Sequence, residues 1–198
     1  MASERAYSMT NRAAAAAVTR DKILRAVLQL ATEKLTVEIV LADVAERSGV
    51  AVQTILRHFG TRDALFDEAV SYGASEIVDE RATPVGDIPK AVEVIMDHYE
   101  GRGDWVVALL RQEASDERIR AITEQGKLIH RAWVLAVFGP QLAQRAEPEL
   151  LTDLLVVATD VSCWKLLRRD RGLGRAATER AMRVLVEAIL GASLSESE

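Results

Sequence analysis

Hydrophobic side chains recur at helical spacing along most of the chain. Ile23, Val27, Leu30 and Ala31 occupy positions i, i+4, i+7 and i+8, which predicts an amphipathic helix from about Thr19. The same kind of pattern predicts further helices at roughly 40–47, 51–58, 63–82, 92–99, 105–114, 115–138, 148–169 and 175–190. No alternation of apolar and polar residues extends over a useful length. The pattern therefore predicts an all-α fold.

Glycine and proline residues separate the predicted helices. Pro84, Gly86 and Pro89 break the chain after the long helix at 63–82, and two further helices are predicted to end at Gly101-Arg-Gly103 and at Gly139-Pro140. The residues before Thr19 show no apolar periodicity. We therefore predict a flexible N-terminal arm (1–18), a small helical domain (19–66) and a larger helical body (67–198).

Length and composition indicate a folded protein outside the membrane. The chain has 198 residues, of which 49% are hydrophobic, enough to form a packed core. The longest stretch without Asp, Glu, Lys or Arg runs from Ala132 to Gln144, shorter than the about 20 residues of a membrane-spanning helix. The N-terminal residues do not resemble a secretory signal, so we expect a cytoplasmic protein with no membrane partner. A single cysteine excludes an intramolecular disulfide and a cysteine-based zinc site.

Charge is distributed unevenly along the chain. The net charge is −5, but residues 1–62 hold nine Lys or Arg against six Asp or Glu, a balance of +3. Residues 63–198 hold the other sixteen basic and twenty-four acidic residues, a balance of −8. A mildly basic front with an acidic remainder is typical of a small polyanion-binding domain attached to a body with another task.

The segment from Leu41 to Phe59 has the spacing of a helix-turn-helix. This motif needs a small residue where its helices cross, a glycine able to adopt positive φ in the turn, and aliphatic side chains that join the helices. These positions are occupied by Ala45, Gly49, Val50 and Ile55. The outer surface of the second helix is then formed by Val52, Gln53, Thr54, Arg57 and His58. An ordinary helical hairpin with a glycine turn has the same spacing, so both interpretations stay open on spacing alone.

Three segments together resemble the DNA-binding domain of the tetracycline-repressor (TetR) family of transcriptional regulators. They are Thr19-Arg-Asp-Lys-Ile-Leu-Arg-Ala, Leu41-Ala-Asp-Val-Ala-Glu-Arg-Ser-Gly-Val and Thr54-Ile-Leu-Arg-His-Phe-Gly-Thr-Arg-Asp-Ala-Leu-Phe. The resemblance is specific over about residues 19–70, and Thr159-Asp-Val-Ser-Cys-Trp resembles part of the penultimate helix of many members. It implies a homodimer that binds a palindromic double-stranded DNA operator. It also implies a small-molecule effector, expected to be apolar, that enters the helical body and releases the DNA.

The resemblance assigns DNA contacts to the second helix of the motif. Gln53 is suited to a bidentate contact with adenine, and Arg57 to guanine or a phosphate. His58 and Arg62 match phosphate-side positions of the family, whereas the family's phosphate-binding tyrosine corresponds to Leu56. The family's capping threonine is replaced by Ile39-Val40, and a missing cap costs about 1 kcal/mol. Solvated surface is the alternative for Gln53 and Arg57.

The body contains candidates for an effector pocket and a dimer interface. We name as possible pocket residues Met96, Tyr99, Trp105, His130, Trp133 and Cys163, although apolar residues at helical spacing usually form core. A dimer interface is predicted at positions spaced by 4, 3, 4 and 3, namely Leu150, Leu154, Val157, Val161 and Trp164. Asp160 is interpreted as part of a solvated stripe with Glu149 and Asp153.

The function that these patterns favour is a ligand-responsive transcriptional regulator, most simply a repressor. No phosphate-binding loop, metal-ligand cluster or nucleophile beside a base occurs, so we expect no enzyme activity, no cofactor and no metal. The alternative is a regulator-like helical dimer that has lost operator binding and serves as a small-molecule or protein-binding module. Leu56 and the missing cap motivate this alternative, and the salt dependence of DNA binding distinguishes the two.

Overall fold

The chain folds into two compact helical units, which are described separately. This computed structural model describes residues 2–34 and 38–191. The first unit extends to Ser75 and the second begins at Glu76, so the division falls within one long helix rather than at 66/67. All regular elements in the described ranges are helices, as the sequence pattern predicted.

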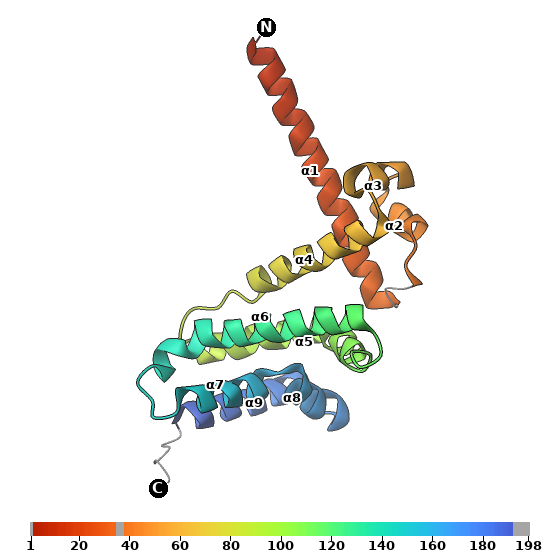
Figure 1. The fold of residues 1–198 in the computed structure, drawn as a ribbon. Helices are drawn as coiled ribbons and strands as arrows, with labels where there is room; N and C mark the ends of the chain where they lie inside the picture. Colours follow the sequence, from red (N-terminus) through yellow and green to blue (C-terminus); the bar gives the residue numbers. More distant parts are fainter. Residues whose placement is uncertain (1, 35–37, 192–198) are drawn as a thin grey trace. The chain divides into compact units, whose positions relative to one another are not determined.

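The first unit is built from three helices and the beginning of a fourth (Figure 1). They are α1 (Ala2–Glu33), α2 (Leu41–Ser48), α3 (Val52–Phe59) and α4 (Arg62–Glu80). Their apolar faces share one core, which includes Ile23, Val27, Val44 and Ile55. Burial of these faces, rather than intrinsic propensity, stabilises helices as short as α2 and α3.

The start of α1 differs from the prediction. The helix begins at Ala2 instead of Thr19, so the segment expected to be an arm without helical structure is helical. Residues 13–18 are exposed, and no core packs on them to produce an apolar stripe. The run Ala13–Ala17 nevertheless favours helix, because alanine has the highest helix propensity. Absence of apolar periodicity is therefore a poor guide in this segment.

The second unit is a two-layer helical bundle (Figure 1). One layer contains α5 (Ile88–Leu110) and α6 (Glu117–Leu142), and the other contains α7 (Pro148–Thr159), α8 (Val161–Lys165) and α9 (Arg175–Gly191). A π-helical turn, η2 (Leu166–Asp170), follows α8. The core between the layers includes Ile95, Phe138, Leu155 and Trp164.

Two predicted helix ends are wrong. Gly101 and Gly103 lie inside α5, which joins the helices predicted at 92–99 and 105–114. A Cβ at Gly103 would lie 2.5 Å from the Trp164 ring, so this glycine allows close packing instead of ending the helix. Pro140 lies in the last turn of α6, which continues to Leu142.

The helix predicted at 148–169 is interrupted at Asp160. This residue has an extended conformation (φ −72°, ψ 154°), ends α7 and caps α8, and its side chain accepts a hydrogen bond from the Ser162 N–H. The expected solvated stripe is therefore wrong for Asp160. Glu149 and Asp153 do form ion pairs at the surface, both with Arg131.

None of the helices in the described ranges is long and apolar enough to cross a membrane.

Candidate functional site

The turn between α2 and α3 has the geometry of a glycine-terminated helix. Gly49 adopts φ 68°, the left-handed conformation that glycine takes with little strain. Its N–H donates to the Glu46 carbonyl, and the Val50 N–H donates to the Ala45 carbonyl at 3.1 Å. These bonds turn the chain within a few residues, so that Ile55 is buried in the same core as Val44.

The outer face of α3 carries the side chains proposed for DNA contact. Gln53 and Arg57 are exposed, and Val52, Thr54 and His58 are half-buried. Leu56 is also exposed, at the position where the family resemblance places a tyrosine. The first turn of α3 contains no acidic residue, and Arg57 and His58 stand in its last turn. This face can therefore approach a polyanion without carboxylate repulsion from its own helix.

The N-terminus of α2 has no capping threonine, but a carboxylate in its first turn accepts a backbone N–H there. The Val40 side chain makes no capping hydrogen bond, but the Asp43 carboxylate accepts the Val40 N–H at 2.9 Å. Lys34 also binds this carboxylate, at 2.6 Å. The Lys34 ammonium and then the Val40 N–H lower the pKa of Asp43 below its usual range. The expected loss of helix capping is thus partly offset by a side chain inside the first turn.

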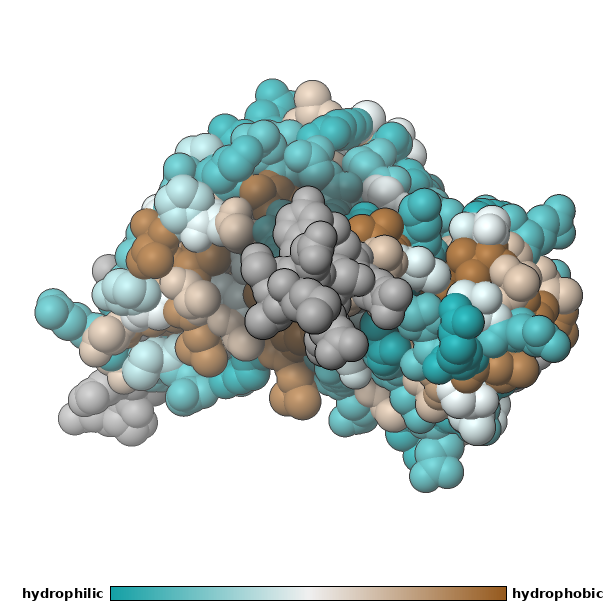
Figure 2. Space-filling model, turned by 90° about the horizontal axis from the view of Figure 1, so that it is seen from above, coloured by the Kyte–Doolittle hydropathy of each residue, from teal (hydrophilic) through white to brown (hydrophobic). Residues whose placement is uncertain are grey.

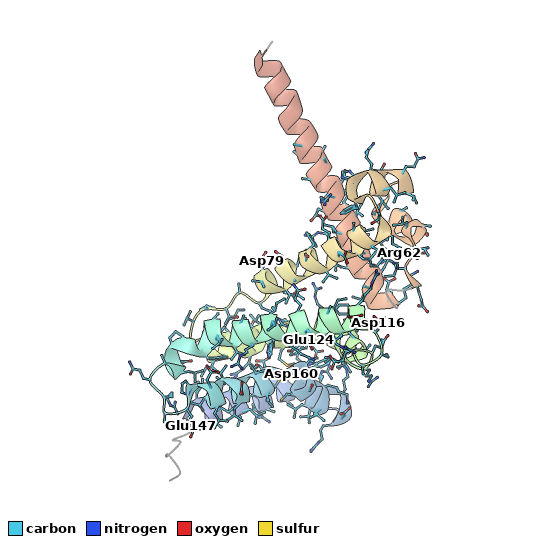
Figure 3. The ribbon with its side chains drawn as sticks, in the orientation of Figure 1. Arg62, Asp79, Asp116, Glu124, Glu147 and Asp160 are labelled. Carbon is cyan, nitrogen blue, oxygen red and sulfur yellow. The ribbon has the colours of Figure 1, made fainter. Side chains whose placement is uncertain are left out.

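Two arginines connect the α2–α3 motif to the other helices of the first unit. Arg62 lies at the start of α4 (Figure 3). It donates to the Ile39 carbonyl from Nε at 3.2 Å and from a terminal nitrogen at 3.0 Å, and its guanidinium lies 4.3 Å from the centre of the Phe66 ring. Arg20 pairs with Glu68, stacks on Phe59 and donates to the His58 carbonyl. Both guanidinium groups therefore have structural contacts as well as charge.

The residues named as a possible effector pocket do not share one environment. Met96, Tyr99, His130 and Trp133 are buried, whereas Trp105 and Cys163 are half-buried. Met96, Tyr99 and Trp133 all lie in the hydrophobic core. The polar groups of Tyr99, His130 and Trp133 also take part in a hydrogen-bonded cluster inside the bundle, described next. Burial raises the pKa of the Cys163 thiol, and the Asp160 charge raises it further.

A hydrogen-bonded cluster occupies the region beside the α7–α8 break. The Tyr99 hydroxyl donates to the Thr159 carbonyl at 3.0 Å. The Thr159 hydroxyl donates to the Leu155 carbonyl at 2.7 Å and lies 3.2 Å from His130 Nε2, which is also 3.3 Å from the Val156 carbonyl. His130 Nε2 therefore carries the proton, and its Nδ1 faces Arg81 at 3.5 Å. These groups satisfy carbonyls that the helix break leaves without intrahelical partners.

Sequence reasoning missed Arg81, which lies at the centre of this cluster. Trp133 Nε1 donates to its carbonyl at 2.9 Å, and its guanidinium lies 5.7 Å from the Tyr99 ring centre. It follows α4 directly, in a region predicted only as the end of a helix. A basic residue at a helix end is common, so only its tertiary burial marks it as unusual.

The predicted dimer face is divided by the fold. Leu150, Leu154 and Val157 are exposed on α7, but Val161 and Trp164 are buried in the core of their own chain. These last two residues are therefore wrong as interface residues. The helix break changes the direction of the chain, so the 4, 3, 4, 3 spacing no longer describes one face. Exposed Val184 and Leu185 lie on α9, which packs against α7.

Comparison with known proteins gives one family match. Residues 23–69 match the family model described as "Bacterial regulatory proteins, tetR family". These residues form a tetR-family domain. The match extends from Ile23 in α1 to Ala69 in α4, and it contains the whole α2–α3 motif together with Arg62. The identification rules out the ordinary helical hairpin, and a tetR-family domain is a DNA-binding regulatory module.

A comparison with solved structures finds a similar fold over most of the chain. A transcriptional regulator from Rhodococcus sp. Rha1, known from its crystal structure, shares 20% sequence identity with a TM-score of 0.62. The alignment covers 89% of this chain and 98% of that protein. The overall helical fold of this chain is therefore similar to that of this protein. The comparison with curated proteins gives no match.

Proposed function

We propose that this chain is a ligand-responsive transcriptional regulator, most simply a repressor, which binds a palindromic operator as a homodimer. The observation that carries the proposal is the exposed face of α3 within a tetR-family domain. In a helix-turn-helix, the second helix enters the major groove and presents its outer side chains to the base edges.

The residues on and beside α3 have different proposed tasks. Gln53 reads adenine through a bidentate hydrogen bond, and Arg57 binds guanine or a phosphate. Thr54 contacts a phosphate or a thymine methyl group, and Val52 contributes apolar contact. His58 and Arg62 approach the phosphate backbone, which fixes the position of the helix without reading sequence.

The homodimer is proposed to form through α7 and α9. Leu150, Leu154 and Val157 repeat at 4 and 3 on α7, and Val184 and Leu185 extend an exposed apolar surface on α9. Exposed hydrophobic residues also occur among hydrophilic ones on the face drawn in Figure 2, so exposure alone does not identify an interface. The helical repeat is the property that favours a second copy of the same pair of helices.

The effector is proposed to bind inside the body. It weakens DNA affinity by binding more tightly to a conformation in which the two DNA-binding domains of the dimer no longer fit successive major grooves. The polypeptide connection between the domains is α4, which begins at Arg62 in the DNA-binding unit and ends at Glu80 in the body. This helix is therefore the element through which the body acts on the head.

The test begins with selection of an operator from random double-stranded DNA, followed by affinity measurements at several salt concentrations. A repressor head that contacts several phosphates loses affinity steeply as salt rises. Gln53→Ala should cost about 1 to 3 kcal/mol on the selected operator and much less on random DNA. Gln144→Ala, which truncates an exposed glutamine of the body, is the matched control and should change neither affinity. Selection that yields no enriched sequence favours the alternative, a regulator-like dimer without operator binding.

A further inference from the structure

Arg81 is a buried cation without an anionic partner. Its side chain is 7% exposed, and none of the carboxylates in the described residues lies within ion-pair distance of its guanidinium. Its Nε is buried without a hydrogen-bond partner. By contrast, other arginines of the body pair with acidic residues, as Arg168 does with Glu100 and Arg169 with Asp104. Buried charges in proteins are normally paired, because desolvation of an isolated ion is costly.

The carboxylates around Arg81 are engaged elsewhere. Glu80 pairs with Arg102 at 3.2 Å and lies 3.4 Å from His98 Nδ1. Asp160 accepts the Ser162 N–H at the start of α8 (Figure 3). Both interact with Arg81 electrostatically from beyond ion-pair distance. Neither supplies the bidentate pairing that a guanidinium makes with a carboxylate.

The histidines beside Arg81 are uncharged and do not offset its positive charge. Burial, followed by the Arg81 charge, lowers the pKa of His98 to about 2 and that of His130 to about 4. Both imidazoles are therefore neutral at neutral pH, and His130 already presents its Nδ1 lone pair to Arg81. His98 Nδ1 is buried and makes no hydrogen bond. The cluster thus contains a buried guanidinium charge without a direct ion-pair partner and two buried nitrogens, Arg81 Nε and His98 Nδ1, without hydrogen-bond partners.

Two aromatic residues lie beside this charge, together with the polar groups described above. The Tyr99 ring faces the guanidinium, and Trp133 is hydrogen-bonded to the Arg81 carbonyl and stacked on His130, with ring centres 5.8 Å apart. Both aromatic residues belong to the hydrophobic core of the body. A molecule that fits these neighbours has one anionic group and an apolar remainder.

We propose that Arg81 binds the carboxylate of a small organic acid with an apolar or aromatic body, and that this acid is the effector. The proposal rests on the effector-responsive function proposed above, and it adds an anionic group to the small apolar effector that the family resemblance implies. A carboxylate matches the planar fork of the guanidinium and neutralises its buried charge. Because the cluster is buried, the acid enters only when neighbouring helices separate, which couples binding to a change of conformation.

The test uses the full chain and four probes: octanoate and phenylacetate, each compared with its primary amide. Binding is measured by calorimetry and by the rise in melting temperature. We expect the acids to bind and stabilise the protein. The amides have nearly the same shape but are uncharged and replace one acceptor oxygen with an NH2 donor, and we expect them to do neither. Arg81→Met should weaken acid binding by about 10- to 100-fold, the range of a charge-assisted hydrogen bond. Arg175→Met removes an arginine that pairs with Asp97 at the surface, and it should leave acid binding unchanged.

A second readout separates a binding role of Arg81 from a structural one. If the role of Arg81 is to bind an anion, Arg81→Met without acid should melt at the same or a higher temperature than the unmodified protein. The reason is that the substitution removes an unpaired buried charge. A lower melting temperature of this variant would show that Arg81 stabilises the fold and would overturn the proposal. Equal binding of acid and amide to the unmodified protein overturns it independently of any variant.

Measuring acid binding and operator binding on the same protein distinguishes this proposal from the proposed function. Operator binding without any acid binding contradicts the carboxylate site and leaves the regulator intact. Acid binding that leaves operator affinity unchanged contradicts the effector role, while the Arg81 site stands as a binding site. We expect the acid to bind the unmodified protein and to weaken its operator affinity. In Arg81→Met, acid binding should be weaker by the factor given above, and the same acid concentration should have less effect on operator affinity.

Discussion

Arg57 and Arg62 both lie near the end of α3, but their surroundings differ. Arg57 is exposed, whereas Arg62 binds the Ile39 carbonyl and stacks on Phe66. A side chain with structural contacts contributes to folding through those contacts, and one without them acts only on what approaches from solvent. The two arginines therefore separate DNA affinity from stability.

We predict that Arg62→Ala lowers the free energy of unfolding by about 1 to 3 kcal/mol, through lost hydrogen bonds and a lost cation–π contact. Arg57→Ala should leave stability within about 0.5 kcal/mol and weaken DNA binding. Urea unfolding and DNA titrations on both variants provide the measurements. Equal stability of the two variants would contradict the structural role of Arg62.

Among the helices, α5 depends on one glycine and tolerates another. Gly103 faces the Trp164 ring, whereas a Cβ at Gly101 would meet no atom within 4 Å other than those of its own stretch of helix. Arg169 covers the same indole at 4.5 Å from its ring centre, which limits movement of Trp164 away from α5. The two glycines are separated by one residue in a continuous helix, so they form a matched pair.

Gly103→Ala should destabilise the protein by about 1 to 3 kcal/mol, because the new methyl group overlaps the Trp164 ring. Gly101→Ala should stabilise it by about 0.5 to 1 kcal/mol, because alanine is the better helix former. Thermal and urea unfolding of both variants test this. A gain in stability from both substitutions would show that Trp164 moves aside at little cost.

At the scale of the whole molecule, the proposed homodimer would form through the exposed apolar residues of α7. Val157, one of the proposed interface residues, is 65% exposed, and Leu128 on α6 is exposed to a similar extent, 70%. We predict that Val157→Glu converts a dimer into a monomer at micromolar concentration, because a buried unpaired charge opposes association. Leu128→Glu should remain dimeric. Sedimentation distinguishes the outcomes, and a monomeric unmodified protein would refute the interface.

The buried histidines make the stability of the body depend on pH. His98 is near Arg81, Arg102 and Glu80, and His130 is near Arg81 and Asp160. Their pKa values, about 2 and about 4, lie below the ordinary histidine value of 6.5, so the unfolded chain binds more protons than the folded one below that value. The contribution of these histidines to the free energy of unfolding is therefore fully present above about pH 6.5. It is lost as pH falls, by up to about 1.4 kcal/mol per pH unit for each histidine.

Unfolding in urea between about pH 7 and pH 5 measures this slope. His130→Asn should reduce it by up to about 1.4 kcal/mol per pH unit, because one titrating group is removed from the unfolded chain. His58→Gln, which removes a half-buried histidine of the DNA-binding unit, is the control for the body. Loss of stability that is unchanged in His130→Asn would assign the pH dependence to other groups.

The sequence by itself determined the all-helical fold, the α2–α3 motif and the residues on its outer face. These features follow from local rules: Gly49 is needed where φ is positive, and Ile55 and Gln53 fall on opposite faces because of the helical period. Tertiary structure decided what local rules leave open. Gly103 is a packing position because Trp164 occupies the adjacent space. Asp160 interrupts a helix, and the carbonyls freed there accept hydrogen bonds from Tyr99 and His130. Arg81 is buried because helices distant in sequence surround it. Contacts between residues far apart in the chain produce these properties, and no pattern along the chain records them.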